Sequence, residues 1–212
     1  MDTILGASIG AVQVVIGHPL DTAKTLLQNG QSWSKLSVRQ FYRGWTWPIA
    51  ASVAFNAVAF PVYHRALQEA PSPYAAGLVS GFAVAPIEYG FGVGKIRQQT
   101  QTHLPWHGRG FVMATVRTTL AMSVYFGVYE DLKSTVGPFL AGACAGVANW
   151  TLTYPFDLIA TRQIASRLTI REACALGKWS KGYWPCIARA ILVNSVSFKM
   201  YDMCYTHHDR TI

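Results

Sequence analysis

The sequence predicts an all-α membrane protein in which six membrane-spanning helices form three pseudosymmetric repeats of two helices each. Its 212 residues are 51% hydrophobic and only 13% charged, whereas soluble domains carry about 25% charged residues. A short proline motif also recurs three times at nearly equal intervals. Because internal repeats outrank other fold signals, the predicted structural unit is one third of the chain.

The recurring motif is a proline followed two residues later by a carboxylate, at the end of an apolar stretch. The three copies are Pro19-Leu-Asp21, Pro86-Ile-Glu88 and Pro155-Phe-Asp157. A proline inside a helix removes a backbone hydrogen bond, so each of these prolines is expected to kink its helix. A charge at membrane depth requires a partner or water, and the three carboxylates should therefore face away from lipid.

The basic residues are sorted by segment. Twelve Lys and Arg residues lie in the stretches 24–43, 95–109 and 162–181, where Glu172 is the only acid. The turns between these stretches hold acids as well as bases. Such alternation follows the positive-inside rule for an even number of spanning helices. It explains the net charge of +8 without nucleic acid as a partner.

Each third of the chain holds two apolar segments. The expected helices cover residues 3–28, 45–68, 74–98, 111–134, 139–166 and 183–205, and short surface helices are expected within 36–42 and 169–176. Helices of this length can cross a hydrocarbon core about 30 Å thick. The repeats are expected at 1–70, 71–135 and 136–212. Glycines four residues apart on the odd helices, such as Gly77 and Gly81, predict close helix contacts.

A second element follows each basic loop. It is a basic residue before a glycine, at Arg43-Gly44, Arg109-Gly110 and Lys181-Gly182. Seven residues beyond each glycine lie Ala51, Arg117 and Arg189, and twelve residues further lie Tyr63-His64, Tyr129-Glu130 and Tyr201-Asp202. With these motifs the chain resembles the mitochondrial carrier family, from Gly6 to about Tyr205. The resemblance implies a multi-pass transporter of the mitochondrial inner membrane. It would work by alternating access, with one salt-bridge network closing each side.

The resemblance assigns the matrix-side gate to residues after the three prolines. They are Asp21, Lys24, Gln28, Glu88 and Asp157. The family's basic position is occupied by Phe91 in the second repeat and Ala160 in the third. We therefore expect Lys95 or Arg97, and Arg162, to substitute as partners of the carboxylates.

On the cytoplasmic side, Glu130 and Lys133 match the family's motif fully, whereas Asp202 has lost its basic partner to Tyr205. The first repeat has His64 where the acid is expected. One intact pair on each side predicts closed states that are held weakly. Such a carrier would be leaky, differently gated or unable to cycle.

The candidate substrate site consists of Arg117, Thr118, Arg189 and Lys199. An Arg at mid-depth costs roughly 2.5–3.5 kcal/mol on insertion scales, so it normally faces a cavity. Two guanidinium groups favour an anion, because Arg presents a planar fork to carboxylate or phosphate. In the family, Arg followed by a small polar residue resembles carriers of keto acids and carboxylates. The alternative is that both arginines pair structurally with acids or helix-end carbonyls.

The remaining side chains indicate no chemistry. The tryptophans Trp33, Trp45, Trp47, Trp106, Trp179 and Trp184 cluster near expected helix ends and predict an interfacial belt. The four Cys and six His have no metal-ligand spacing. No catalytic triad or phosphate-binding glycine loop is evident in the sequence. We therefore expect a protein that is not an enzyme and that has no cofactor.

Two functions follow from these patterns. The first is a carrier that moves an anionic metabolite, a carboxylate or keto acid, across the mitochondrial inner membrane. The second is a degenerate, non-transporting protein that serves as a structural subunit of a larger inner-membrane complex. The expected partners are the small anionic metabolite, membrane lipid including cardiolipin at the matrix side, and, for the second function, that complex.

Overall fold

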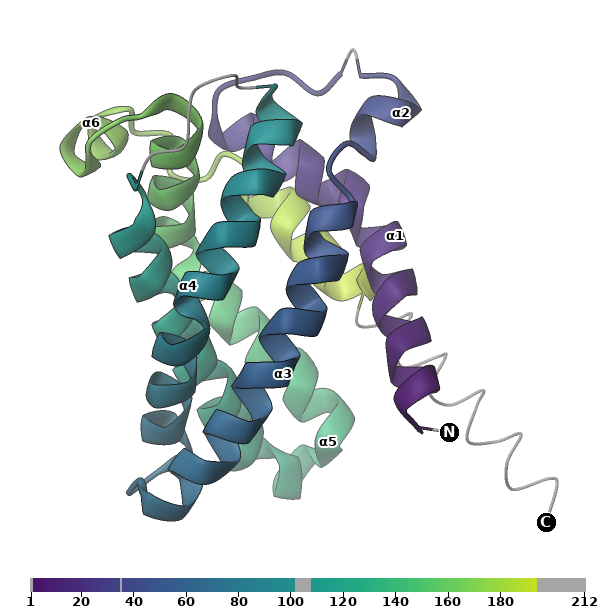
Figure 1. Cartoon of the computed structure of the whole chain (residues 1–212), viewed down its shortest axis with the longest axis vertical. Coiled ribbons are helices and arrows are strands. Elements are labelled where there is room, and N and C mark those ends of the chain that lie inside the picture. The colour runs from purple at the N-terminus through teal and green to yellow at the C-terminus, as the bar shows by residue number, and fades with distance from the viewer. Residues whose placement is uncertain (1, 35, 102–107, 194–212) are drawn as a thin grey trace, which may run out of the picture.

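The computed structural model describes residues 2–34, 36–101 and 108–193, and the regular elements in these ranges are all helices (Figure 1). The long helices are α1 (Asp2–Gln28), α3 (Thr46–Glu69), α4 (Pro73–Thr100) and α5 (Phe111–Ser166). The short ones are α2 (Val38–Phe41) and α6 (Ile170–Ala175). A further apolar helix covers Tyr183–Val193.

Helix α5 is two helices joined at a glycine. Gly137 has the non-helical angles φ 82° and ψ 159°, which a residue without a Cβ adopts readily. With this break, the long helices agree with the expected segments to within a few residues. The all-α membrane fold is thus confirmed, while the sixth helix is described only as far as Val193.

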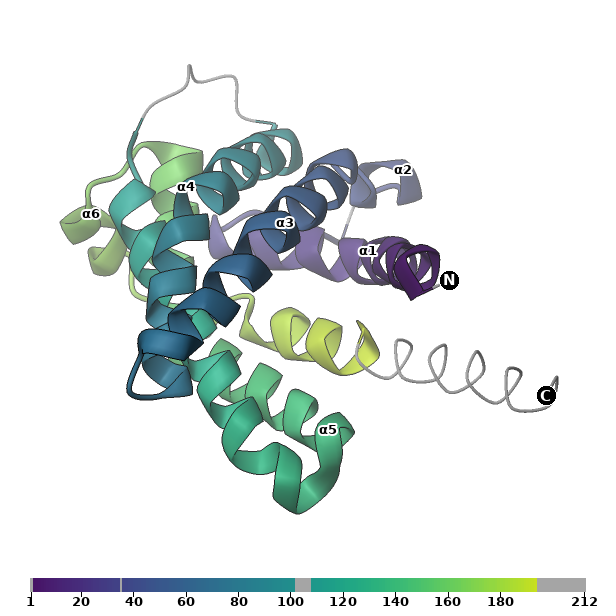
Figure 2. The same cartoon turned by 60° about the horizontal axis from the view of Figure 1, so that its bottom comes forward.

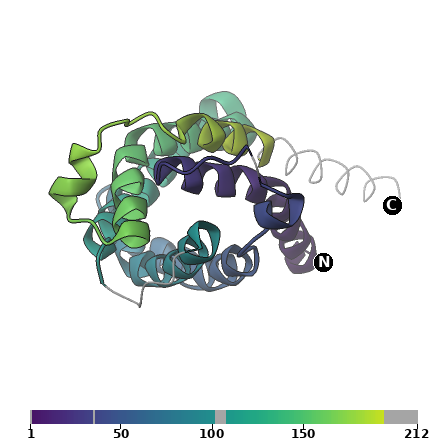
Figure 3. The same ribbon diagram turned by 90° about the horizontal axis from the view of Figure 1, so that it is seen from above.

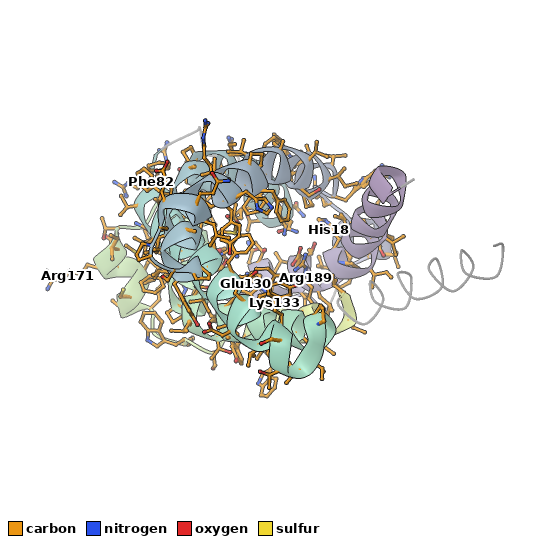
Figure 4. All side chains as sticks on the ribbon, turned by 90° about the horizontal axis from the view of Figure 1, so that it is seen from below. His18, Phe82, Glu130, Lys133, Arg171 and Arg189 are labelled. Carbon is orange, nitrogen blue, oxygen red and sulfur yellow. The ribbon has the colours of Figure 1, made fainter. Side chains whose placement is uncertain are left out.

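Within the part of the chain that the structure describes, three segments are long and apolar enough to cross a membrane, namely Val38–Glu69, Pro73–Thr100 and Phe111–Pro138. Large apolar side chains on them remain exposed, among them Phe82 at 68% and Val112 at 61%. Figure 4 places Phe82 on the outer face of the helices. Exposed apolar residues on spanning helices are suited to contact lipid.

The helices form a ring, as the view along it shows (Figure 3). Helices α2 and α6 lie at the same end, which we call the basic-loop end, and the α3–α4 turn lies at the opposite end (Figure 1). The segment 183–193 runs between α1 and the second half of α5 and completes the ring (Figure 2). A Cβ on Gly17 of α1 would lie 3.0 Å from Arg189 Nε, so these two helices are closely packed.

Local sequence explains where several helices begin. Ser72 caps α4, accepting a hydrogen bond from the Ala75 amide at 3.3 Å, and Pro73 suits the first helical position because its missing N–H would be unsatisfied there. In α6, the Thr169 amide and hydroxyl donate to Glu172 at 2.7 and 2.8 Å. These two hydrogen bonds lower the pKa of the Glu172 carboxyl.

The helices continue through all three motif prolines, Pro19, Pro86 and Pro155. The expected kinks at these residues therefore involve no break in the helix, and their angles stay predictions. A proline in a helix interior removes one backbone hydrogen bond without ending the helix when packing supports both sides.

The glycines after the basic loops repeat one packing contact three times. Gly44, Gly110 and Gly182 have φ angles of +80°, +92° and +87°. A Cβ on each would approach a backbone oxygen on the odd helix of the following repeat. The oxygens are Lys95 O at 3.6 Å, Ala160 O at 3.1 Å and Lys24 O at 2.9 Å, in the order of the glycines. This cyclic contact supports the three-repeat organisation, whose exact boundaries stay predictions.

The carbonyl just before each of these glycines is also held in the same way. His18 Nε2 donates to Arg43 O at 3.0 Å, and Tyr89 OH donates to Arg109 O at 3.1 Å. In the third repeat, the donor to Lys181 O is Tyr154 OH. Each basic loop is thus fixed to the odd helix of its own repeat and packed against that of the next.

The small-residue motifs have unequal roles. A Cβ on Gly77 or Gly81 would come within 2.7 Å of the α5 backbone, so α4 and α5 approach closely there, as expected. Among the described residues, a Cβ on Gly142, the first glycine of the third pair, would meet nothing within 4 Å. The close contact expected at this pair stays a prediction.

Candidate substrate cavity and ion-pair network

A cavity of about 360 Å³ lies among the long helices. The three positions seven residues beyond the loop glycines all line it, which brings Ala51, Arg117 and Arg189 together. Its other charged walls are Asp21, Lys24, Glu88, Lys95 and Asp157. In Figure 4, Arg189 lies inside the ring of helices, whereas Arg171 of α6 lies at the outer edge.

Asp21 has two basic partners from different helices. Lys95 Nζ of α4 lies 2.8 Å from Asp21 Oδ2, and Arg189 Nε lies 2.8 Å from Asp21 Oδ1. Lys95 stands one turn beyond Phe91, which occupies the family's basic position. The structure therefore places this substitute base where a partner was expected.

Asp157 is bound from the first repeat. Lys24 Nζ lies 2.8 Å from Asp157 Oδ2, and Gln28 Nε2 donates to the same oxygen at 2.8 Å. Lys24 and Gln28 are one turn apart on α1, which puts both on the same helix face. These contacts join α1 to α5 at the basic-loop end.

Glu88 is bound by two neighbouring residues of α5. Arg117 forms an ion pair with Glu88 Oε1, and Thr118 Oγ1 donates to Glu88 Oε2 at 2.6 Å. Arg117 Nε also lies 3.9 Å from Asp157 Oδ1. Arg117 therefore bridges the carboxylates of the second and third repeats.

Among the described residues, four bases face three carboxylates in this cluster, which leaves one positive charge in excess. The indole of Trp150 covers two of the bases, with Lys24 Nζ 4.4 Å and Arg117 Cζ 4.9 Å from its ring centre. An aromatic face stabilises a cation by its quadrupole. Both substrate-site arginines thus have acidic partners, the arrangement that the structural alternative anticipated.

Arg162 is placed differently from the expectation. It is 3% exposed, and its guanidinium donates to three carbonyls, Gln28 O at 3.1 Å, Ala173 O at 2.8 Å and Gly177 O at 2.8 Å. Five donors in a fixed fork suit such a cluster of carbonyls. Arg162 joins α6 and its following loop to the end of α1, and no ion pair to a motif carboxylate is present among its described contacts.

The residues expected in the cytoplasmic-side gate are only partly described. Lys133 Nζ lies 2.5 Å from Glu130 Oε2, and both belong to α5. This pair does not join two helices. At the same end, Tyr74 OH of α4 donates to Asp131 Oδ2 at 2.7 Å and does connect neighbouring helices. Asp202 and Lys199 lie outside the described residues.

Two tryptophans at the cavity escaped the sequence interpretation. Trp47 was expected in the interfacial belt, but it lines the cavity and packs on Phe91, with ring centres 6.1 Å apart. Its spacing of one turn before Ala51 is a signal for the same helix face. Trp150 precedes Pro155 by five residues, far from a helix end, and could have been recognised by that position. Among the described residues, no three His, Cys, Asp or Glu side chains gather as a metal site.

Comparison with known proteins gives one family match and several relatives. The family described as "Mitochondrial carrier protein" matches residues 133–210. "Solute carrier family 25 member 45" of Mus musculus is 26% identical over 94% of this chain and 96% of its own. The "Glutamate/glycine mitochondrial carrier ymc1" of Schizosaccharomyces pombe is 27% identical over 97% and 94%. The "Mitochondrial arginine transporter BAC2" of Arabidopsis thaliana is 26% identical over 94% and 88%.

The alignment with the mouse protein runs over 279 positions, more than the 212 residues of this chain, so part of the relative lies opposite gaps. The shared family and the spanning helices confirm the predicted localisation, a multi-pass protein of the mitochondrial inner membrane. They also confirm that the protein is a transporter-type membrane protein and not an enzyme. Over nearly its whole length the chain is thus similar to mitochondrial carriers, and it is shorter than the relatives it matches.

Proposed function

We propose that this carrier moves a small carboxylate, such as a keto acid, across the inner membrane by alternating access. The excess positive charge of the cavity, with Arg117 and Arg189 at two of its three symmetric positions, is the observation that carries the proposal. Glutamate, glycine and arginine, the cargoes in the relatives' names, all contain a carboxylate. A pocket of about 360 Å³ is within the usual range for small-molecule sites.

The proposed coupling is an exchange of carboxylates. A substrate carboxylate that binds Arg189 competes with Asp21, and one that binds Arg117 competes with Glu88. Breaking a buried ion pair without replacement strands a charge, whereas replacing one carboxylate by another does not. A ligand shifts a conformational equilibrium only by its difference in affinity for the two states. The substrate would therefore loosen the matrix-side network while keeping the arginines paired.

Reconstituted protein tests this proposal directly. Liposomes that contain the purified chain should exchange a labelled carboxylate, and Arg117→Ala and Arg189→Ala should each abolish the exchange. Arg171→Ala is the matched control, because Arg171 is exposed on α6. Thermal unfolding of each variant shows whether it is folded. Full exchange by folded Arg117→Ala and Arg189→Ala proteins would contradict the proposal.

A second candidate is a structural subunit of a larger inner-membrane complex. It is favoured by one observation, that both arginines already have acidic partners while Glu130 and Lys133 pair within one helix. In that case the protein should co-purify stoichiometrically with a large complex, and its depletion should dissolve that complex. Migration as a free protein in mild detergent would reject this candidate.

A further inference from the structure

We infer that the carried carboxylate has an apolar tail, and that the tail occupies a second chamber beside the ion-pair network. The inference rests on the proposed carboxylate transport and adds the class of substrate. The chamber has a volume of about 310 Å³. Its walls are largely apolar and aromatic, formed by Ala59, Phe60, Ala121, Met122, Tyr125 and Phe126.

The two cavities meet at the proposed site of the carboxylate. Phe55, Glu88 and Arg117 line both of them. Ala121 and Tyr125 follow Arg117 by four and eight residues on α5, so the three share one helix face. The rise of about 1.5 Å per residue puts Ala121 about 6 Å further along the helix than Arg117. A molecule whose carboxylate binds Arg117 thus directs the rest of its length along this wall.

The chemistry of the chamber excludes a second charged group. Glu88, Arg117 and Thr118 at its floor already bind one another, and the other polar groups of the described wall are the uncharged Asn149 amide and Tyr125 hydroxyl. Among the described residues, the carboxylate at the far end of a dicarboxylate would lose hydration here without gaining a cation, which is unfavourable. An apolar tail instead releases water from apolar walls.

The far wall is rigid enough to select for shape. Phe126 stacks on Tyr63 with ring centres 3.7 Å apart and planes 12° apart. Both rings belong to a packed cluster with Ala59 and Met122. Close-packed side chains respond to a change of even one methylene. Both the length of the substrate tail and substitutions that fill the chamber should therefore change the apparent affinity.

The test uses two series of substrates, and the members of each series share one head group. Straight-chain 2-oxo acids and the matching 2-amino acids, each with three to six carbons, are offered to the reconstituted full chain. In the series with the preferred head, we expect the apparent affinity to rise about fourfold per added methylene, the equivalent of about 0.8 kcal/mol. Across three methylenes the expected gain is about 60-fold.

Two substitutions change the chamber in opposite ways. Ala121→Leu fills it and should reduce the gain between three and six carbons by roughly tenfold or more, since about three methylenes of wall contact are displaced. Asn149→Leu makes the wall more apolar and should increase the gain. Ala83→Leu is the matched control, because Ala83 is exposed on the outer face of α4. Thermal unfolding is measured for each, and Asn149→Leu keeps the test decisive if Ala121→Leu does not fold.

The outcomes separate this inference from the proposed function. If the three-carbon acid is exchanged but affinity is flat or falls with tail length, the inference is overturned and carboxylate transport stands. The inference is also overturned, and carboxylate transport stands, if affinity rises with tail length but neither Ala121→Leu nor Asn149→Leu changes that rise. A lipid acyl chain that filled the chamber would give this result. If no carboxylate of any length is exchanged by folded protein, both are overturned.

Discussion

Lys95 Nζ lies 2.8 Å from Asp21 Oδ2, so α4 supplies a base to the first repeat from one turn beyond the family's position. That position holds Phe91, whose ring packs on Trp47 instead. Residues four apart lie on one face of a helix, which lets the charge move by a turn and still face the same partner. The second repeat has therefore exchanged the usual base for an aromatic contact and retained an ion pair across the interface.

Removing this base should weaken the closure of the cavity at the basic-loop end, the proposed matrix side. In Lys95→Ala, Asp21 retains Arg189, so we expect a loss of about 1.5–3 kcal/mol, the range for one hydrogen bond to a charged group. Thermal unfolding in detergent measures the stability. Labelling of a cysteine introduced in the cavity by a reagent added from the matrix side measures the opening.

Arg97→Ala provides the control for that experiment. Arg97 lies in the same turn of α4, and its Nε has no hydrogen-bond partner within the described residues. Its removal should leave the labelling rate close to that of the wild type. Equal effects of the two substitutions would show that Lys95 acts only through the general charge of this end.

The hydroxyl of Thr118 should stabilise the protein, whereas the hydroxyl of the adjacent Thr119 should not. Thr118 Oγ1 donates to Glu88 at 2.6 Å, whereas the buried hydroxyl of Thr119 has no hydrogen-bond partner in the described structure. Thr118→Val keeps the shape and removes the donor, so we expect a loss of about 1.5–3 kcal/mol. Thr119→Val should be neutral or stabilising, because it removes an unsatisfied buried group.

Stability is again read by thermal unfolding, and carboxylate exchange is measured on the same samples. Because Thr118 holds Glu88 beside Arg117, Thr118→Val should also change the apparent affinity for the substrate. If Thr119→Val destabilises as much as Thr118→Val, the Thr118–Glu88 hydrogen bond contributes nothing measurable.

Local periodicity was enough to predict the helices, whereas the resemblance to carriers and the cost of an Arg at membrane depth put Arg117 and Arg189 at one cavity. Partner choice was harder to predict. Lys95 could be named only as one of two candidates, although helix geometry favours it, because residues 91 and 95 share a helix face and residue 97 lies on another. Arg162 was assigned to the wrong kind of partner, because the carbonyls that it binds exist only after α6 has folded back on α1. Such non-local backbone groups leave no trace in a residue pattern.

The loop glycines offer a test of the cyclic packing between repeats. Gly110 and Gly30 are both turn glycines with positive φ, +92° and +75°, so alanine at either is disfavoured by about 1–2 kcal/mol. A Cβ at Gly110 would also lie 2.8 Å from Ile164 Cγ1, whereas one at Gly30 meets nothing within 4 Å. Gly110→Ala should therefore lower the unfolding temperature clearly more than Gly30→Ala. Equal shifts would mean that the loop yields without disturbing the next repeat.

Arg162 provides the last prediction, because it binds backbone and not a carboxylate. Arg162→Lys keeps the charge but offers one ammonium where three carbonyls, on α1, α6 and the loop after α6, now share one planar fork. If the fork is what matters, Arg162→Lys should lose most of the stability lost in Arg162→Ala, roughly 2 kcal/mol or more. Limited proteolysis between residues 167 and 182 should then accelerate in both variants, and not in the exposed control Arg171→Ala. If instead Arg162→Lys behaves as the wild type while Arg162→Ala does not, charge alone suffices and Arg162 returns to the electrostatic role that the sequence first assigned to it.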